Sequence, residues 1–168
     1  MEAIQAIMSR RSIRRYTDKK IPDKTIITLL KAAMNAPSAH NRQPWHFIVV
    51  DDRDLLKKVP EYHQYSKMLK NASHAIVVLG DTKIQETEFW IHDCSAASEN
   101  ILIAANALDL GAVWLGVHPN KNLISGTKKL FNVPDNVIPL GIISLGYPKE
   151  TKPPRENYIP ERVHMNKW

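Results

Sequence analysis

Apolar residues recur along this chain at two different spacings, and the two spacings predict different elements. Positions 2–9 have the helical spacing. A second helix starts at Asp23, which we expect to be its N-cap, and ends before Pro37. Its apolar stripe comprises Ile26, Ile27, Leu30, Ala33 and Met34. The first quarter of the chain is therefore predicted to be helical.

Strands are predicted to alternate with helices after this point. Aromatic and β-branched runs at 45–50 and 75–79 predict buried strands, joined by a broken helical stretch at 54–71. The longest helix is predicted at 86–110, with Gly111 capping its end. Its apolar residues are Phe89, Cys94, Ala97, Ile101, Ala104, Ala105 and Leu108. The remaining predicted elements are a strand at 112–117, a helix at 120–131 and a strand at 137–145.

This pattern favours one α+β domain over residues 1–168, with about four strands and a long central helix. The composition agrees, because 43% apolar and 24% charged residues are typical of a globular protein. The longest apolar runs are far shorter than the ~20 residues of a membrane span. The N-terminus does not resemble a signal peptide, and the single Cys94 cannot form an internal disulfide. We therefore expect a cytoplasmic protein without a membrane partner.

Positive charge is concentrated near the N-terminus. The net charge is +6, and residues 10–20 contain six cations, Arg10, Arg11, Arg14, Arg15, Lys19 and Lys20, against the single acid Asp18. Such a cluster suggests an anionic partner. Nucleic acid is one possibility, but the cluster lacks an evident recognition helix and interleaved aromatic residues. We expect no nucleic-acid partner.

The segment 10–15 places four guanidinium groups, those of Arg10, Arg11, Arg14 and Arg15, around the single hydroxyl of Ser12. Guanidinium groups offer rigid forks of donors that match phosphate oxygens, and the serine adds a neutral partner. The alternative is a solvated basic turn. The cluster is therefore a candidate phosphate site.

A second candidate site is the segment 37–45, which prolines stiffen at positions 37 and 44. Asn41 and Gln43 offer neutral amides directly before a predicted strand, although such residues are also common in ordinary turns. Amide and hydroxyl groups suit the polar edge of a planar ring. A phosphorylated ring cofactor, such as flavin mononucleotide (FMN), would satisfy both sites.

Weaker signals come from Gly116, Lys152 and Arg155. Gly116 interrupts a buried strand, which indicates either a bulge or the close approach of a ligand. Lys152 and Arg155 lie in a proline-rich tail. They are either solvent-exposed or additional hydrogen-bond donors to a phosphate. The chain contains no G-x-G-x-x-G, no phosphate-binding P-loop motif, no H-E-x-x-H and no G-x-S-x-G. We expect no metal site and assign no catalytic side chain.

At these residues the chain resembles the short members of the nitroreductase family over nearly its whole length. The motifs that carry the resemblance are 10–14, 36–45, 93–105, 110–116, 145–148 and 162–168. The resemblance implies an α+β homodimer with a mixed, mainly antiparallel sheet flanked by helices. It also implies two FMN sites at the subunit interface, and a tail at 150–168 that packs on the partner subunit.

The resemblance also implies residue roles. Arg10, Arg11, Ser12, Arg14, Lys152 and Arg155 would hold the phosphate and ribityl end of FMN. Asn41 would contact the ring, and Pro37, Ser38, Ala39 and Gln43 would reach the cofactor at the dimer interface. Leu115 and Gly116 would lie against the ring, with the Gly116 N–H facing flavin N5. Many larger members carry an acidic residue where this chain has Leu115.

The activity implied is a ping-pong transfer of hydride from NAD(P)H to an acceptor such as a nitroaromatic or a quinone. Two alternatives keep the flavin. One is reductive dehalogenation or flavin fragmentation, for which no lid segment is evident, and the other is a non-catalytic FMN-binding or redox-sensing protein.

Overall fold

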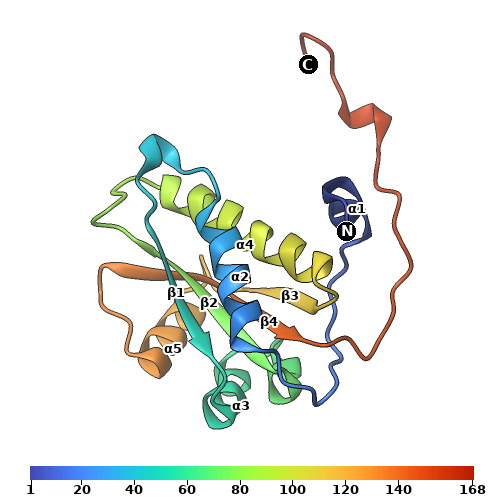
Figure 1. Cartoon of the computed structure of the whole chain (residues 1–168). Coiled ribbons are helices and arrows are strands. Elements are labelled where there is room, and N and C mark those ends of the chain that lie inside the picture. The colour runs from blue at the N-terminus through green and yellow to red at the C-terminus, as the bar shows by residue number, and fades with distance from the viewer.

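Four antiparallel strands form the centre of the molecule, and the computed structural model describes all of residues 1–168 (Figure 1). The order of the strands across the sheet is β1-β2-β4-β3. Their bounds are Trp45–Val50 (β1), His74–Asp81 (β2), Gly111–Gly116 (β3) and Val137–Gly146 (β4). The predicted α+β class and antiparallel sheet are therefore confirmed.

Helices cover both faces of the sheet. The α-helices are α1 (Ala3–Ser9), α2 (Asp23–Met34), α3 (Arg53–Tyr62), α4 (Phe89–Ala107) and α5 (Lys121–Phe131), and three short 3-10 helices are η1 (Ala39–Asn41), η2 (Lys67–Asn71) and η3 (Pro160–Arg162). α2 and α4 pack on one face of the sheet, and α3 and α5 lie on the other. Each face has its own apolar core, because alternate strand residues point to opposite sides.

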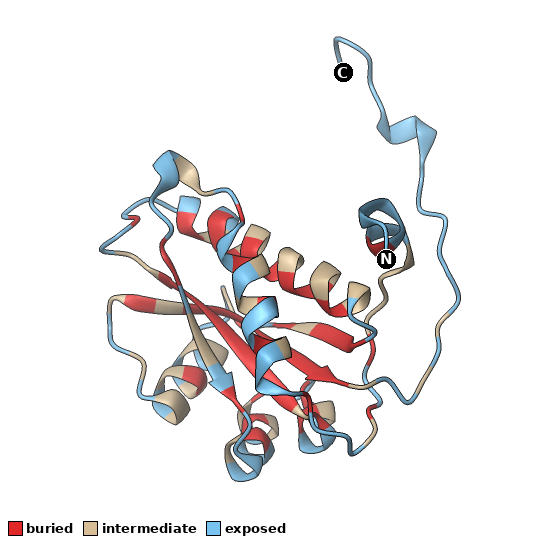
Figure 2. Cartoon of the chain, viewed as in Figure 1, coloured by how far each residue is buried: buried red, intermediate tan, exposed pale blue.

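The central helix α4 is buried along one side, with Trp90, Cys94, Ile101 and Ala105 among its buried residues. Figure 2 shows the buried stripe facing the sheet. This agrees with the predicted helix at 86–110, although its ends are shorter than expected and Phe89 is 47% exposed. The predicted core role of Cys94 is confirmed, since its side chain is fully buried.

Two predicted helix caps are wrong. Pro22, not Asp23, is the N-cap of α2, and Asp23 lies in the first turn, where its charge favours the helix N-terminus. Gly111 does not cap α4, because Leu108 is the C-cap and Asp109 adopts the left-handed backbone conformation instead. Gly111 is the first residue of β3, and its role lies in packing.

The apolar stripe predicted for α2 is also partly wrong. Ile26, Leu29 and Ala33 are buried, whereas Ile27 and Met34 are about half exposed. The inward face is therefore rotated relative to the predicted one.

The C-terminal segment leaves the body of the molecule (Figures 1 and 2). Every residue from Pro153 to Trp168 is exposed, and the tail carries Tyr158, Val163, Met165 and Trp168 among its apolar residues. The first helix is similarly apolar on its outside, since Ile4 and Met8 are more than 60% exposed. Both segments thus carry several large apolar side chains that this chain does not cover.

Candidate functional site

The arginine segment is held along the edge of the sheet. The Ile13 N–H donates to the Ala112 carbonyl at 2.9 Å, and Tyr16 forms a bridge with Pro148. The Tyr16 hydroxyl donates to the Ile13 carbonyl at 2.8 Å and lies 3.3 Å from the Ser144 carbonyl. Burial raises the pKa of this hydroxyl well above its ordinary value, so it remains protonated as a donor.

Two glycines make this docking possible. A Cβ on Gly111 would lie 2.6 Å from Ile13 Cγ2, and a Cβ on Gly146 would lie 2.6 Å from Tyr16 Cγ. Neither glycine has a positive φ, so the backbone conformation does not require glycine at these positions. The close approach of the Ile13 and Tyr16 side chains does. The ends of β3 and β4 thus form a shelf on which residues 12–16 lie.

Beside this shelf, basic side chains from both ends of the chain line one depression of about 240 Å³. Its lining residues are Arg10, Arg11, Ser12, Arg14, Lys152, Arg155 and Asn157. The structure therefore brings together six of the predicted phosphate-site residues, although about 140 residues separate the two groups. Sequence reasoning missed Asn157, which no motif distinguishes from the rest of the tail.

The cations of this depression differ in how far they are already paired. Arg10 Nε lies 3.3 Å from Glu99 Oε1, and Lys152 Nζ donates to the Ser12 carbonyl and lies 3.5 Å from Glu150 Oε1. Arg14 and Arg155 form no ion pair within the chain. These two guanidinium groups are therefore the ones most available to an anion.

Arg11 is oriented by backbone carbonyls. Its Nε donates to Pro153 O at 2.9 Å, and its Nη1 donates to Arg10 O at 2.6 Å and to Met8 O at 3.2 Å. Its Nη2 is buried and has no partner. An unpaired donor on an enclosed guanidinium nitrogen is costly, so an anion that accepted from Nη2 would relieve this cost.

The Glu150 carboxylate holds the backbone of the arginine segment. Glu150 Oε1 accepts the Arg14 N–H at 2.6 Å. This hydrogen bond, with the nearby Lys152 ammonium, holds the pKa of Glu150 below its usual range. Glu150 therefore fixes the backbone that carries Arg14 while remaining ionised.

The loop at 37–43 has an unusual backbone. His40, Asn41 and Gln43 all have φ near +50° although none is glycine. Ser38 Oγ accepts the Gln43 N–H at 3.0 Å, and Gln43 Nε2 donates to Asn41 Oδ1 at 3.0 Å. These two amide side chains are exposed, and Asn41 Nδ2 and Gln43 Oε1 make no hydrogen bond within the chain.

The structure does not bring this loop to the basic depression of the same chain. η1 lies beside the N-terminal part of α4, where the Ala39 N–H donates to Asp93 Oδ1. The arginine segment lies towards the other end of α4, where Arg10 pairs with Glu99 and Asn106 Nδ2 donates to Ala6 O. The two predicted parts of the site are therefore separated along one helix.

Leu115 and Gly116 end β3. The Leu115 side chain is 4% exposed and packs in the core beneath α3 and α5. Gly116 is exposed, and a Cβ built there would meet no atom within 4 Å. Because Val117 N–H donates to Leu140 O, strand alternation turns the Gly116 N–H away from β4. Its carbonyl lies 3.0 Å from Nε2 of the buried His63.

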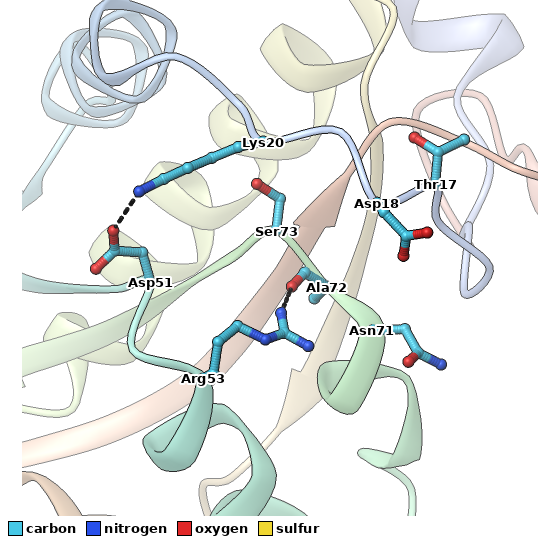
Figure 3. Close-up of a pocket in the computed structure, with 8 residues that line it drawn as sticks. All are labelled: Thr17, Asp18, Lys20, Asp51, Arg53, Asn71, Ala72 and Ser73. Carbon is cyan, nitrogen blue, oxygen red and sulfur yellow. Dashed lines mark hydrogen bonds and ion pairs between the residues drawn. The ribbon is translucent and has the colours of Figure 1, made fainter.

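A second depression, of about 430 Å³, is lined by residues of the 17–21 loop, of the segment that joins β1 to α3, and of η2 and the residues that follow it (Figure 3). Lys20 Nζ and Asp51 Oδ2 are 2.9 Å apart, and the Arg53 guanidinium donates to the carbonyls of Ala72 and Lys70. These charged groups already have partners within the chain. The Lys20–Asp51 pair attaches the residue 17–21 loop to the end of β1, and the Arg53 bonds attach the start of α3 to η2.

No three His, Cys, Asp or Glu side chains gather as metal ligands would. None of the helices combines the length and the hydropathy that a bilayer span requires. Sequence reasoning also missed the buried Asp93, although a polar residue within the apolar stripe of a predicted helix was a usable signal.

Comparison with known proteins gives consistent results. The family model described as "Nitroreductase family" matches residues 7–64 and 60–147. A relative from Methanothermobacter thermautotrophicus, provisionally named NADH dehydrogenase/NAD(P)H nitroreductase, is 47% identical over 100% of this chain and 88% of its own length. A similarly named crystal structure from Parabacteroides distasonis has 40% identity and a TM-score of 0.96, covering 99% of this chain and 98% of that one. A Desulfovibrio desulfuricans protein, provisionally described as a nitroreductase and solved in complex with FMN, has 30% identity and a TM-score of 0.86, covering 100% and 98%.

Proposed function

This chain belongs to the nitroreductase family, and we propose that it is an FMN-dependent oxidoreductase that uses NAD(P)H. The depression lined by Arg10, Arg11, Arg14, Lys152 and Arg155 carries the proposal. A phosphate monoester has nearly two negative charges at neutral pH, and several desolvated cations are needed to replace its hydration.

The residues present fit the phosphate of FMN. Arg14 and Arg155 have no competing ion pair, and the buried Arg11 Nη2 lacks an acceptor. The Ser12 hydroxyl and the Asn157 amide add neutral donors at the same depression. This donor set is more extensive than a solvated basic turn needs.

The complete site is proposed to form in a homodimer. The loop at 37–43 and the basic depression lie apart within one chain, so the loop of a second copy would supply Pro37, Ser38, Ala39, Asn41 and Gln43. The exposed apolar residues of α1 and of the tail at 150–168 support this arrangement. We assign the tail to the surface of the partner subunit, where these residues would be buried.

When bound, FMN would carry hydride from NAD(P)H to a nitroaromatic or quinone acceptor in two separate half-reactions. The exposed Gly116 leaves room for a planar ring and directs its N–H outwards, towards the position proposed for flavin N5. Cations and amide donors near the ring would stabilise negative charge that develops on reduction. No side chain is assigned as a nucleophile or a general acid.

The experiment is a flavin titration of the purified protein. We expect a yellow protein with one FMN per chain and a visible flavin absorbance that NADH or NADPH bleaches in the absence of air. Adding a nitroaromatic or a quinone should restore the colour. A colourless, monomeric protein that does not bind added FMN would refute the proposal. A bound flavin that NAD(P)H cannot reduce would favour a non-catalytic binding role.

Three single variants make this test specific to the depression. Arg14→Ala should weaken FMN binding about 10- to 100-fold, since a hydrogen bond to a charged group contributes about 1.5–3 kcal/mol. Arg10→Ala should cost less, because Glu99 already holds part of its charge. Arg15→Ala is the matched control, because it removes the same charge one residue away from the lining set. Equal losses in Arg14→Ala and Arg15→Ala would indicate general electrostatics instead of a built site.

A further inference from the structure

Asp93 is a carboxylate in the apolar interior of the protein. It lies on the inner side of α4 with Trp90, Cys94 and Ala97, and it is only 4% exposed. Oδ1 accepts the Ala39 N–H at 2.9 Å, and Oδ2 is buried without a partner. A buried carboxylate with so few hydrogen bonds stabilises a fold less than an apolar side chain of similar size does. Stability therefore does not explain this residue.

The segment bonded to Asp93 is the strained loop. Non-glycine residues in the left-handed region cost about 1–2 kcal/mol each, and less for asparagine. His40, Asn41 and Gln43 are all in this region within four residues. The hydrogen bonds of Ser38 and Gln43 close the loop on itself but do not fix it to the rest of the protein. The Asp93 bond does so, at the first residue of η1, and the Arg42 guanidinium adds a longer bond to the Ile84 carbonyl.

We propose that Asp93 is a positioning residue, which holds the loop at 38–43 so that Asn41 and Gln43 face the flavin ring. The inference rests on the proposed function, which places this loop against the cofactor. Without the carboxylate, the Ala39 N–H loses its acceptor and the strained residues relax towards ordinary conformations. The exposed amides then sample several directions, and FMN must order them on binding.

The test separates affinity from stability with two substitutions. Asp93→Leu keeps the branched shape of the side chain, with larger methyl groups in place of the oxygens, and has no acceptor, whereas Asp93→Asn keeps an oxygen that can accept the Ala39 N–H. We expect Asp93→Leu to unfold at the same or a higher urea concentration than the wild type and to bind FMN about tenfold or more weakly. Asp93→Asn should bind FMN within about threefold of the wild type. A purely structural role predicts the opposite for Asp93→Leu, with stability lost and affinity kept once the protein is folded.

A matched control comes from another buried polar residue of the same helix. Ser98 is also buried and polar, but its Oγ donates to the Cys94 carbonyl inside α4. Ser98→Ala should leave the affinity for FMN unchanged. If it weakens binding as much as Asp93→Leu does, the effect belongs to α4 in general and the proposal is wrong.

Two further measurements keep the outcome clear. If Asp93→Leu fails to fold, Asp93→Ala removes the acceptor without adding bulk and is expected to show the same loss of affinity. Amide hydrogen exchange of the cofactor-free protein should show faster exchange at Ala39 in both variants. Wild-type protein that does not bind FMN refutes the proposed function, whereas normal binding by a folded Asp93→Leu or Asp93→Ala protein overturns the role of Asp93 alone.

Discussion

Gly146→Ala should destabilise the protein because the new methyl group has no room. A Cβ at this position would lie 2.6–2.8 Å from three atoms of Tyr16. Tyr16 is 5% exposed and its hydroxyl is bonded, so the ring cannot turn away freely. Overpacking costs about 1–3 kcal/mol, and loss of the Tyr16 hydrogen bond would add about 1 kcal/mol.

A partial compensation comes from the unfolded chain, in which alanine is about 0.4–1 kcal/mol less favourable than glycine for entropic reasons. The net loss should therefore be about 1–3 kcal/mol in the free energy of unfolding. Urea denaturation at a fixed protein concentration measures it, because self-association would otherwise shift the midpoint. Gly116→Ala is the control, since a Cβ there meets nothing, and its stability should be unchanged or slightly higher.

A double-mutant cycle tests the cause. In a Tyr16→Ala background the ring is absent and only the contact with the Cβ of residue 16, at 2.8 Å, remains, so Gly146→Ala should cost less than in the wild type, with a coupling energy of about 1–3 kcal/mol. If Gly146→Ala costs the same in both backgrounds, contact with Tyr16 is not the reason. If it costs nothing in either, the close packing described for this corner is wrong.

Three further outcomes follow from the structure. Burial lowers the pKa of His74, whose Nδ1 lies 2.9 Å from Ser73 Oγ. The His74 imidazole therefore binds a proton more readily in the unfolded chain than in the folded protein. Stability should fall as the pH drops below about 6.5, and thermal melts of His74→Gln should show a weaker dependence there. The pKa of Glu150 is also lowered, so its contribution is present above about pH 4.3 and is lost in more acid solution; Glu150→Gln melts should lose less stability in that range, and an unchanged acid profile would exclude this contribution. Removal of residues 158–168, all exposed, should leave the folded core intact but shift the protein from dimer to monomer in sedimentation, and a persistent dimer would contradict the role proposed for the tail.

The sequence predicted the fold well because its elements are strongly patterned. The long helix α4 and the buried runs of β1 and β2 match their predicted positions within a few residues. The errors occur at positions where contacts between residues distant in the sequence determine the local structure. Gly111 follows a predicted helix and therefore resembled a helix cap. Its actual role is to leave space for the Ile13 side chain, which is almost 100 residues away in the sequence.

The site was predicted unevenly for a similar reason. The Arg10 to Arg14 cluster is local in sequence and is evident from composition. Its pairing with Glu99, the support from Glu150 and the separation of the loop from the depression depend on the fold. The bond between Asp93 and Ala39 joins residues 54 positions apart, and only the polar interruption of an apolar stripe indicated it.

Arg11 joins the two ends of the chain, since its guanidinium donates to Pro153 O at the base of the C-terminal segment. The same segment supplies Arg155 and Asn157 to the depression. An anion seated there would therefore restrict where the following residues can reach, and so favour their docking onto a neighbouring molecule. By thermodynamic reciprocity, assembly would in turn tighten retention of the anion. Dilution of this protein should then release its prosthetic group, and excess prosthetic group should oppose dissociation of the subunits.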